Sequence, residues 1–265
     1  MPERGERILE DVSRQVALGP RAPGSPGHEA LRLRLSEALR QWAGHVHVQE
    51  FTLRLPAGPA ACANLAGVFR GREGLGGAGG LLLGTHFDTR LRADREPDPE
   101  RREAPIPGAN DGGSGTAVLL DLLPDLARAS RAGALERDVT VAFFDAEDVG
   151  EIAGYPFSYG AGQFVSRPPV ALPGEAIVLD MVGGRNLRLD VDAHALHHPP
   201  SWALTARVFG VGARLAPAIF TAAGRGRGTS KVRYIISDQF PFLQVGIASC
   251  LLIDLDYPEW HTQAD

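Results

Sequence analysis

The feature that most constrains the fold is a run of apolar and β-branched residues that leads directly into carboxylates. Residues 139–144 read VTVAFF and residues 145–148 read DAED. An unbroken apolar run of this length is typical of a strand buried on both faces, as in a parallel sheet covered by helices. Open sheets of this kind bind their ligands at the carboxyl ends of the strands. The run therefore predicts an α/β fold with Glu147 and Asp148 at that edge of the sheet.

Two further buried runs end in polar side chains that can bind metals. Residues 81–88 read LLLGTHFD and end with His86 and Asp88, and residues 176–183 read AIVLDMVG and place Asp180 at a strand end. Neighbouring strand termini would bring these side chains together. The sequence therefore predicts one shared site rather than isolated polar residues.

The glycine-rich segment 108–115, GANDGGSG, contains a further acid, Asp111. Its small residues let the backbone bend tightly. A helix is predicted to follow and to end near Arg131, with Ser114 as its N-cap. Asp111 should therefore lie just ahead of a helix N-terminus.

The other elements are predicted from hydrophobic periodicity and from Gly and Pro breaks. Helices are expected at 5–18, 28–42 and 202–211, strands at 46–51, 62–69 and 247–253, and loops at 71–80, 89–107, 149–162 and 222–229. The first two strands should pair as an antiparallel hairpin at the sheet edge. The charged loop at 89–107 is expected to be solvated, near the entrance to the site.

Composition limits the classes of function. With 265 residues, 44% of them hydrophobic, the chain has ample core, and we expect residues 1–265 to form a single domain. A formal net charge of -5 without a basic patch argues against nucleic acid as the main partner. No segment approaches the roughly 18 apolar residues of a membrane span, and no signal peptide is recognised. We expect a soluble, cytoplasmic protein, although an incomplete N-terminus would leave a secreted or periplasmic location open. The oligomeric state is also left open.

Seven side chains form one candidate constellation: His86, Asp88, Asp111, Glu147, Asp148, Asp180 and His261. Cys62 and Cys250 lie inside apolar runs and are expected to be buried, free thiols. The sequence offers neither a nucleophile elbow nor a phosphate loop among these segments. Oxygen and imidazole ligands without thiolate suit a catalytic zinc ion, which takes three protein ligands and keeps one position open.

Five motifs, in this order, resemble the zinc peptidase family M28. They are THFD at 85–88, GANDGGSG at 108–115, FFDAED at 143–148, LD at 179–180 and WHT at 260–262. Within the family the chain is most similar to the branch that holds the animal-type glutaminyl-peptide cyclotransferases and their bacterial relatives. The resemblance runs from residue 19 to the last residue. It implies a three-layer αβα sandwich with a mostly parallel mixed central sheet, of the zinc aminopeptidase type.

The resemblance also implies roles for the site residues. The zinc ion common to the family would be bound by Asp111, Asp148 and His261. Glu147 would be the general acid/base. Two-zinc aminopeptidases of the family use the equivalents of His86 and Asp180 for a second metal, bridged by Asp111, whereas the cyclases bind one zinc and use the acid at Asp180 in a proton relay. Asp88 would orient His86. One zinc ion is therefore expected, with a second left open.

Two reactions at the N-termini of peptides or proteins fit these roles. In the cyclase, which is the preferred interpretation, Glu147 takes a proton from the α-amine of an N-terminal Gln and returns one to the departing ammonia, leaving pyroglutamate. In the aminopeptidase alternative, Glu147 deprotonates the water that attacks the first peptide bond. A third hypothesis, a catalytically silent binding protein on this scaffold, is disfavoured because a complete set of ligands and base would be a demanding coincidence.

Residues around the site are expected to form the substrate pocket. Trp260 favours the cyclase, in which an aromatic wall lines the glutamine pocket. The run Ser237, Asp238 and Gln239 stands where animal cyclases carry Asp-Asp-His. The carboxylate that would partner Asp180 in the relay is thus replaced by Ser237. The chain also stops where relatives continue into a final helix, so we expect that helix to be absent.

Overall fold

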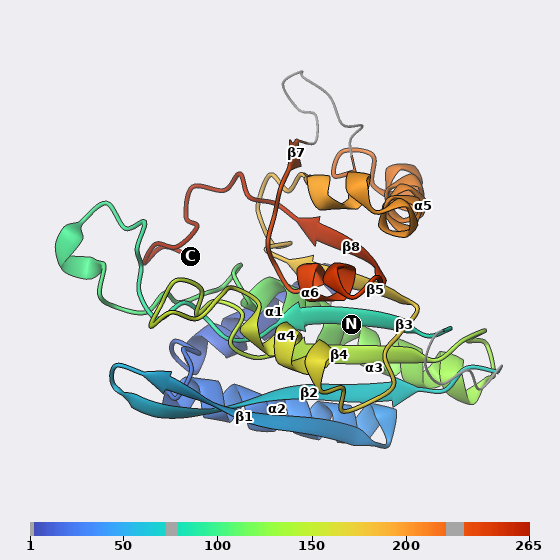
Figure 1. Ribbon diagram of the computed structural model, residues 1–265, viewed down its shortest axis with the longest axis horizontal. Helices are drawn as coiled ribbons and strands as arrows, with labels where there is room; N and C mark the ends of the chain where they lie inside the picture. The colour runs from blue at the N-terminus through green and yellow to red at the C-terminus, as the bar shows by residue number, and fades with distance from the viewer. Residues whose placement is uncertain (1–2, 73–78, 221–230) are drawn as a thin grey trace.

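The computed structural model describes residues 3–72, 79–220 and 231–265. Its centre is a six-stranded sheet with the strand order β1-β2-β4-β3-β5-β8 (Figure 1). The strands are β1 (Val46–Leu55), β2 (Gly58–Phe69), β3 (Leu81–His86), β4 (Val139–Phe144), β5 (Glu175–Asp180) and β8 (Ala248–Ile253). β3, β4, β5 and β8 run parallel, whereas β2 is antiparallel to both β1 and β4. The predicted mostly parallel mixed sheet is confirmed.

Helices lie on both faces of the sheet, which confirms the predicted three-layer arrangement (Figure 1). On one face, α2 (Pro26–Ala43) and α3 (Gly113–Arg131) pack against the strands, and α1 (Arg4–Ala17) packs against α3. The other face carries α4 (Tyr159–Ser166) and α6 (Gln239–Gln244), while α5 (Pro199–Leu215) packs against the edge strand β8. The remaining described elements are β6 (Val191–Asp192), β7 (Val232–Arg233) and the 3-10 turns η1 (Pro99–Arg101) and η2 (Ala193–His197).

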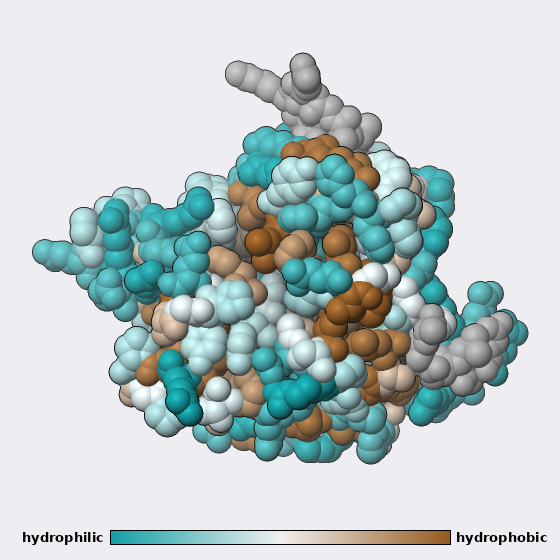
Figure 2. Space-filling model, in the orientation of Figure 1, coloured by the Kyte–Doolittle hydropathy of each residue, from teal (hydrophilic) through white to brown (hydrophobic). Residues whose placement is uncertain are grey.

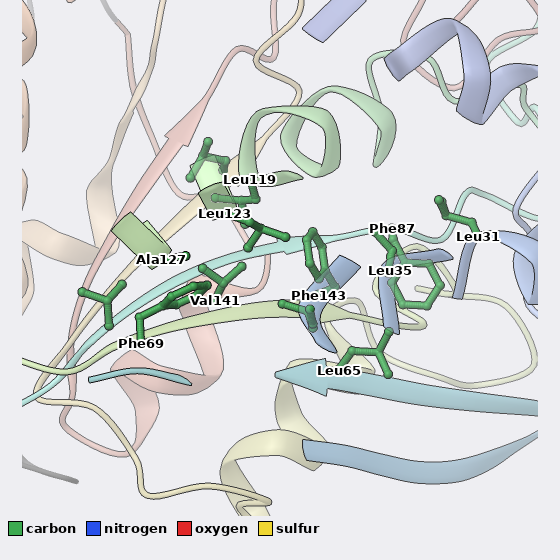
Figure 3. Packing of buried hydrophobic residues seen from close by; sticks show 13 residues of the cluster. Leu31, Leu35, Leu65, Phe69, Phe87, Leu119, Leu123, Ala127, Val141 and Phe143 are labelled. Carbon is green, nitrogen blue, oxygen red and sulfur yellow. The ribbon is translucent and has the colours of Figure 1, made fainter. Parts of the chain in front are cut away.

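The central strand β4 contributes side chains to the core on both of its faces. Phe143 lies in one buried cluster with Leu35 of α2 and Leu123 of α3 (Figure 3). The next residue, Phe144, points to the opposite face, where its ring packs edge-on against Phe164 of α4 with centroids 5.5 Å apart. Burial on both faces is what the unbroken apolar run predicts for a central strand.

The predicted helices and strands are present, with boundaries that differ by a few residues. The prediction of Ser114 as an N-cap is wrong, because α3 already begins at Gly113. The N-cap is Gly112, whose φ of 78° is left-handed and whose Cβ, if it had one, would lie 2.4 Å from a backbone oxygen. The hydroxyl of Ser114 instead donates to the carbonyl of Asn110 at 2.7 Å and accepts the amide N–H of Val182 at 2.9 Å.

The loop at 89–107 is only partly solvated, because both of its ends fold into the protein. Arg90, Ala93 and Ile106 are buried, so the expectation of a solvated loop is wrong for these ends. The middle, around η1, projects from the molecule (left in Figure 1), and its surface is hydrophilic (Figure 2). The predicted loop at 149–162 ends early, since α4 begins at Tyr159. The predicted loop at 222–229 and most of that at 71–80 lie outside the described residues.

Two expectations from composition can be compared with the structure. Cys62 and Cys250 are buried and free, as predicted. Within the ranges that the structure describes, no helix has both the length and the apolar character needed to cross a membrane.

Candidate active site

The carboxyl ends of the parallel strands bring the candidate residues together. β3 lies between β4 and β5, and it ends at His86. His86 pairs in register with Phe144, the last residue of β4, directly before the acidic turn at 145–148. Asp180 is the last residue of β5, on the other side of β3. The strand order therefore places acids on both sides of His86.

Asp111, Asp148 and His261 form what we call the first triad. Their potential ligand atoms all lie within 4.8 Å of one another, and all three residues are buried. His261 Nε2 lies 3.6 Å from Asp111 Oδ2 and 3.5 Å from Asp148 Oδ1. The three residues come from the turn before α3, the turn after β4 and the C-terminal segment. The fold thus brings together the three side chains to which the resemblance gives the zinc ion.

His86, Asp111 and Asp180 form the second triad, which shares Asp111 with the first. Their potential ligand atoms also lie within 4.8 Å of one another. His86 Nε2 is 3.3 Å from Asp111 Oδ1 and 3.2 Å from Asp180 Oδ1. The two oxygens of the Asp111 carboxylate therefore face different imidazoles, and a carboxylate in this position can bridge two metal ions.

Asp88 shapes the acidic turn. Its carboxylate accepts the amide N–H of Glu147 at 3.0 Å and that of Asp148 at 3.1 Å. Its carbonyl oxygen lies 3.2 Å from His86 Nδ1, which leaves the Nε2 atom of that ring to face the second triad. Between strand and turn, Ala146 has a φ of 59° and redirects the chain. Neighbouring residues that would point to opposite faces of a strand can therefore serve one site.

Glu147 lies beside both triads without belonging to either. Its carboxylate accepts a hydrogen bond of 3.0 Å from the hydroxyl of Ser158. Burial raises the pKa of Glu147 well above its usual range, and the carboxylates of Asp238 and Asp180 raise it further. A carboxyl group with a raised pKa can accept and return a proton near neutral pH. Glu147 therefore has the environment of a general acid/base.

Backbone strain is concentrated around these residues. Ala146, Ser158, Met181 and His261 are non-glycine residues in the left-handed region, with φ angles of 59°, 58°, 48° and 58°. His261 is itself a candidate site residue, and Ala146 and Met181 adjoin Glu147 and Asp180 in the chain. Ser158 donates a hydrogen bond to Glu147. Such conformations cost about 1–3 kcal/mol each and persist only where the surrounding structure enforces them.

The sequence model of peptidase family M28 matches residues 64–265, which include both triads and Glu147. The chain belongs to peptidase family M28. The family predicted from the five motifs is therefore confirmed, and the match begins in β2 and continues to the last residue. No curated protein sequence matches the chain.

Solved bacterial structures resemble this M28 chain over nearly its whole length. A Zn-dependent exopeptidase from Parabacteroides distasonis superposes with a TM-score of 0.83 at 25% identity, covering 98% of this chain and 89% of that one. A glutaminyl cyclase from Tannerella forsythia superposes with a TM-score of 0.82 at 26% identity, covering 98% of this chain and 90% of that one. A leucine aminopeptidase precursor from Bacteroides thetaiotaomicron superposes with a TM-score of 0.81 at 25% identity, covering 97% of this chain and 88% of that one. Cyclases and exopeptidases are thus similar to this chain to the same degree.

The donor set of this M28 chain fits a zinc ion. Asp148 Oδ2 is buried and has no hydrogen-bond partner among the described residues. Leaving a buried carboxylate oxygen unsatisfied is costly, and a bound cation would remove the cost. The ligands are carboxylates and imidazoles without thiolate, a combination that suits zinc at a catalytic centre.

The residues predicted to line the pocket have different surroundings in this M28 chain. The hydroxyl of Ser237 donates to Asp180 Oδ2 at 2.8 Å, so the relay position keeps a hydrogen bond although it lacks a carboxylate. Asp238 is fully buried, and neither of its carboxylate oxygens has a partner among the described residues. Burial raises the pKa of Asp238 well above its usual range. Gln239 donates through its amide to Asp192 at 3.0 Å, not to a residue of either triad.

Trp260 lies against the first triad, since its ring centroid is 4.6 Å from that of His261. The guanidinium of Arg95 lies 3.7 Å from the centroid of the Trp260 ring, a cation–π contact. One face of the predicted aromatic wall is therefore covered by a residue of the chain itself.

Sequence reasoning missed two side chains that support the first triad. Arg90 contacts Asp148 Oδ1 at 3.2 Å, and Asp94 Oδ1 lies 2.9 Å from His261 Nδ1. Both belong to the loop that was expected to be solvated. The sequence holds one usable signal, which is the position of these two residues. Arg90 and Asp94 are four residues apart and come shortly after the motif THFD at 85–88.

The N-terminal segment and the first turn of α2 also hold turns at the site. His28 Nε2 lies 2.8 Å from Asp145 Oδ1, and this carboxylate raises the pKa of His28 although burial lowers it. Arg21 is buried, and its guanidinium donates to the carbonyl of Gly108 at 2.5 Å, in the turn that leads to Asp111. Asp145, the first acid of the turn after β4, therefore ties the turn to α2 and belongs to neither triad.

Proposed function

We propose that the protein is a zinc-dependent enzyme of peptide N-termini, and that it is a glutaminyl-peptide cyclotransferase. It would convert an N-terminal Gln of a peptide or protein to pyroglutamate and release ammonia. The observation that carries the proposal is the unequal state of the two triads. Among the described residues, the first triad has a buried ligand atom without a hydrogen-bond partner, whereas His86 and Asp180 of the second triad have theirs.

The second triad needs no ion to satisfy its polar atoms. His86 has both ring nitrogens engaged, Nδ1 with the carbonyl of Asp88 and Nε2 with Asp180 Oδ1, each at 3.2 Å. The other oxygen of Asp180 accepts the hydroxyl of Ser237 at 2.8 Å. In the first triad, by contrast, Asp148 Oδ2 has no partner within the described part of the chain. The contrast supports one zinc ion, bound at the first triad, as the resemblance implies for the cyclases.

In the proposed reaction, the zinc ligands and Glu147 have separate roles. The zinc ion would be held by Asp111, Asp148 and His261, and when bound it supplies positive charge that polarises the side-chain amide of the substrate. Glu147 takes a proton from the α-amine as this nitrogen attacks the amide carbon of the Gln side chain. It then gives the proton to the amide nitrogen as the C–N bond breaks and ammonia leaves. The raised pKa of Glu147, caused first by burial, suits both transfers.

A zinc aminopeptidase is the second candidate, and the sharing of Asp111 between two triads favours it. A carboxylate that bridges two metal ions is common among hydrolases. In this reaction Glu147 would take the proton from the water that attacks the first peptide bond. The two candidates differ in metal content and in product, so one set of measurements separates them.

The test combines zinc analysis with product analysis. Zinc per chain is measured on the purified protein, and wild type and Glu147→Gln are each given a Gln-initiated peptide and an amino-acyl anilide. We expect about one zinc ion per chain, pyroglutamate and ammonia from the peptide, and roughly 10²–10⁴-fold slower turnover by Glu147→Gln with zinc retained. Glu151→Gln, at an exposed acid of the following turn, is the matched control.

Each part of the proposal can be contradicted separately. Release of a free amino acid without pyroglutamate would overturn the cyclase and favour the aminopeptidase. Undiminished turnover by Glu147→Gln would overturn the assignment of proton transfer. A protein without zinc that acts on neither substrate would indicate a binding protein on this scaffold.

A further inference from the structure

We propose that Arg90 and Asp94 form a brace that holds two of the three ligands of the first triad, Asp148 and His261, in place for zinc. The brace rests on the proposed zinc enzyme, but it concerns metal affinity and not the identity of the substrate. It makes Arg90 and Asp94 positioning residues.

Arg90 holds the turn that carries Asp148. Its side chain is 2% exposed. One terminal nitrogen, Nη1, contacts Asp148 Oδ1 at 3.2 Å, the carbonyl of Asp148 at 3.1 Å and the carbonyl of Gly150 at 3.2 Å. The guanidinium also lies 5.3 Å from the ring centroid of Phe157. Arg90 contacts only Oδ1 of this carboxylate, and Oδ2 has no partner among the described residues, so the carboxylate keeps an oxygen that can bind a metal ion.

Asp94 links this guanidinium to the imidazole of His261. Its Oδ2 accepts Arg90 Nε at 2.9 Å and Nη2 at 2.5 Å, and its Oδ1 accepts His261 Nδ1 at 2.9 Å. A carboxylate at Nδ1 orients the imidazole of His261, so that its Nε2 faces the first triad.

The contacts form a series from Asp148 through Arg90 and Asp94 to His261, and a metal ion bound between Asp148 and His261 would close it into a ring. The backbone joins the same partners, since the amide N–H of Arg95 donates to the carbonyl of His261 at 3.1 Å. The second triad is held differently, by Asp88 and by Ser237. Loss of the brace should therefore weaken the first triad and leave the contacts of the second intact.

Arg90 also brings a positive charge close to the metal position, and this charge opposes a cation. If charge were its main effect, removing it would tighten zinc binding. If positioning is its main effect, removing it weakens zinc binding, because Asp148 and His261 lose their support. The sign of the change separates the two effects.

The test measures zinc affinity by competition with a chelator in the full-length protein, without any assay of turnover. Arg90→Met and Asp94→Ala should each lower zinc affinity roughly 10- to 100-fold, as loss of an outer partner of a ligand commonly does. Arg90→Lys keeps the charge but cannot span Asp148 and Asp94 together, so it should also lose affinity. Arg101→Met and Asp98→Asn change exposed residues of the same loop and should leave the affinity unchanged.

The double variant Arg90→Met with Asp94→Ala distinguishes a brace from two independent contacts. Its loss of affinity should be clearly smaller than the product of the two single losses, because either change alone breaks the ring. Wild-type or tighter zinc binding by Arg90→Met would overturn the proposal, and so would independent effects of the two changes. If either of these variants fails to fold, Arg90→Lys and the near-isosteric Asp94→Asn carry the same test, and wild-type affinity in both would overturn it. If the brace variants lose zinc affinity as expected but the wild type makes no pyroglutamate, only the proposed cyclase is overturned.

Discussion

At the scale of single residues, the protonation of Glu147 depends on the hydroxyl of Ser158. This hydroxyl donates to the Glu147 carboxylate at 3.0 Å, and the amide N–H of Ser158 donates to the carbonyl of Glu147 at 3.0 Å. A hydrogen bond to the charged form lowers the pKa of a carboxyl group. It therefore opposes burial, which raises the pKa of Glu147. Ser158 keeps the carboxylate available as a base.

Ser158→Ala should raise the pKa of Glu147 further. A hydrogen bond to a charged group contributes about 1.5–3 kcal/mol, and Ser158→Ala removes this stabilisation of the ionised form. Because Glu147 must be ionised to take a proton, the acid limb of the pH profile of kcat/KM should move to higher pH. Ser166→Ala, which removes an exposed hydrogen bond to a backbone carbonyl, is the control. An unmoved acid limb in Ser158→Ala would contradict the prediction.

The ligand-type residues could be predicted because their positions follow from a general rule of parallel sheets. His86 and Asp180 end apolar runs, and such ends meet at one edge of the sheet. Arg90 and Asp94 could not be predicted in the same way, because they lie in an irregular loop, where periodicity gives no direction to side chains. The charge and the Pro content of the loop suggested that it is exposed to solvent, whereas Arg90 is buried and forms ion pairs with Asp94 and Asp148.

At the scale of elements, α4 packs unusually close to the end of β4. A Cβ added at Gly160 would lie 1.8 Å from the carbonyl oxygen of Asp145 and 2.7 Å from the side-chain oxygen of Asn64. Gly162, one half-turn further along α4, would meet nothing within 4 Å. The absence of a side chain at Gly160 therefore lets the helix approach the turn that carries the candidate base.

Gly160→Ala should lower the free energy of unfolding by about 2–3 kcal/mol, because the helix must move away from the strand end. Gly162→Ala should raise it by roughly 0.5–1 kcal/mol, since Ala is the better helix former and has space there. Urea unfolding of the two variants and wild type measures both changes. Equal stabilities of the two variants would show that close approach of α4 is not required.

α2 gives a second comparison within one helix. Leu35 is fully buried in the core cluster, whereas Leu33 is 54% exposed. Leu35→Ala should lower the free energy of unfolding by about 2–5 kcal/mol through lost burial and the cavity left behind. Leu33→Ala should change it by no more than about 0.5 kcal/mol. Thermal or urea unfolding checks the pair, and a cost at Leu33 equal to that at Leu35 would contradict the assigned buried face.

The elements themselves could largely be predicted from periodicity, because long apolar patterns report which faces are buried. The start of α3 could not, since Ser114 has the composition of an N-cap but the left-handed turn at Gly112 fixes the boundary. That turn depends on contact with Asp88, which is distant in the sequence. At this position a tertiary contact overrides the local preference of Ser for the N-cap.

At the scale of the whole molecule, buried charge at the site is a liability for the metal-free protein. Burial raises the pKa of Glu147, Asp148 and Asp238 well above their usual range, with neighbouring carboxylates adding to the rise. Burial lowers the pKa of His86, but Asp180 outweighs it, and that pKa lies well above its usual 6.5. A group whose pKa is raised by folding contributes stability below its unfolded pKa and loses that contribution as pH rises through the folded pKa. All four groups act in the same direction.

The metal-free protein should therefore lose stability as pH rises from about pH 4, the usual pKa of the three carboxyl groups, toward alkaline pH. Zinc binding requires deprotonated ligands, so the stabilisation by zinc should grow over the same range. Calorimetric Tm values with a chelator and with excess zinc, taken across this range, measure both trends. A metal-free Tm that rises with pH would contradict the assigned shifts.

We also propose that residues 1–265 unfold as one unit, because one six-stranded sheet connects segments from β1 to β8. Heating the metal-free protein should give one transition, with calorimetric and van't Hoff enthalpies in a ratio of about one. Two separate transitions would indicate independent domains. Destabilisation by Leu35→Ala should shift the whole transition and not a part of it.

The left-handed residues around the site have a consequence for the evolution of heat resistance. Glycine at Ala146 would relieve backbone strain at the cost of one buried methyl group, since glycine adopts positive φ without steric cost. Met181 differs, because its side chain packs in a buried cluster and glycine there would leave a cavity that outweighs the relief. Glycine at position 146 would also loosen the turn beside Glu147. A mutant library selected only for survival on heating should therefore tolerate glycine at position 146 and reject it at position 181. A library selected for turnover should keep Ala146.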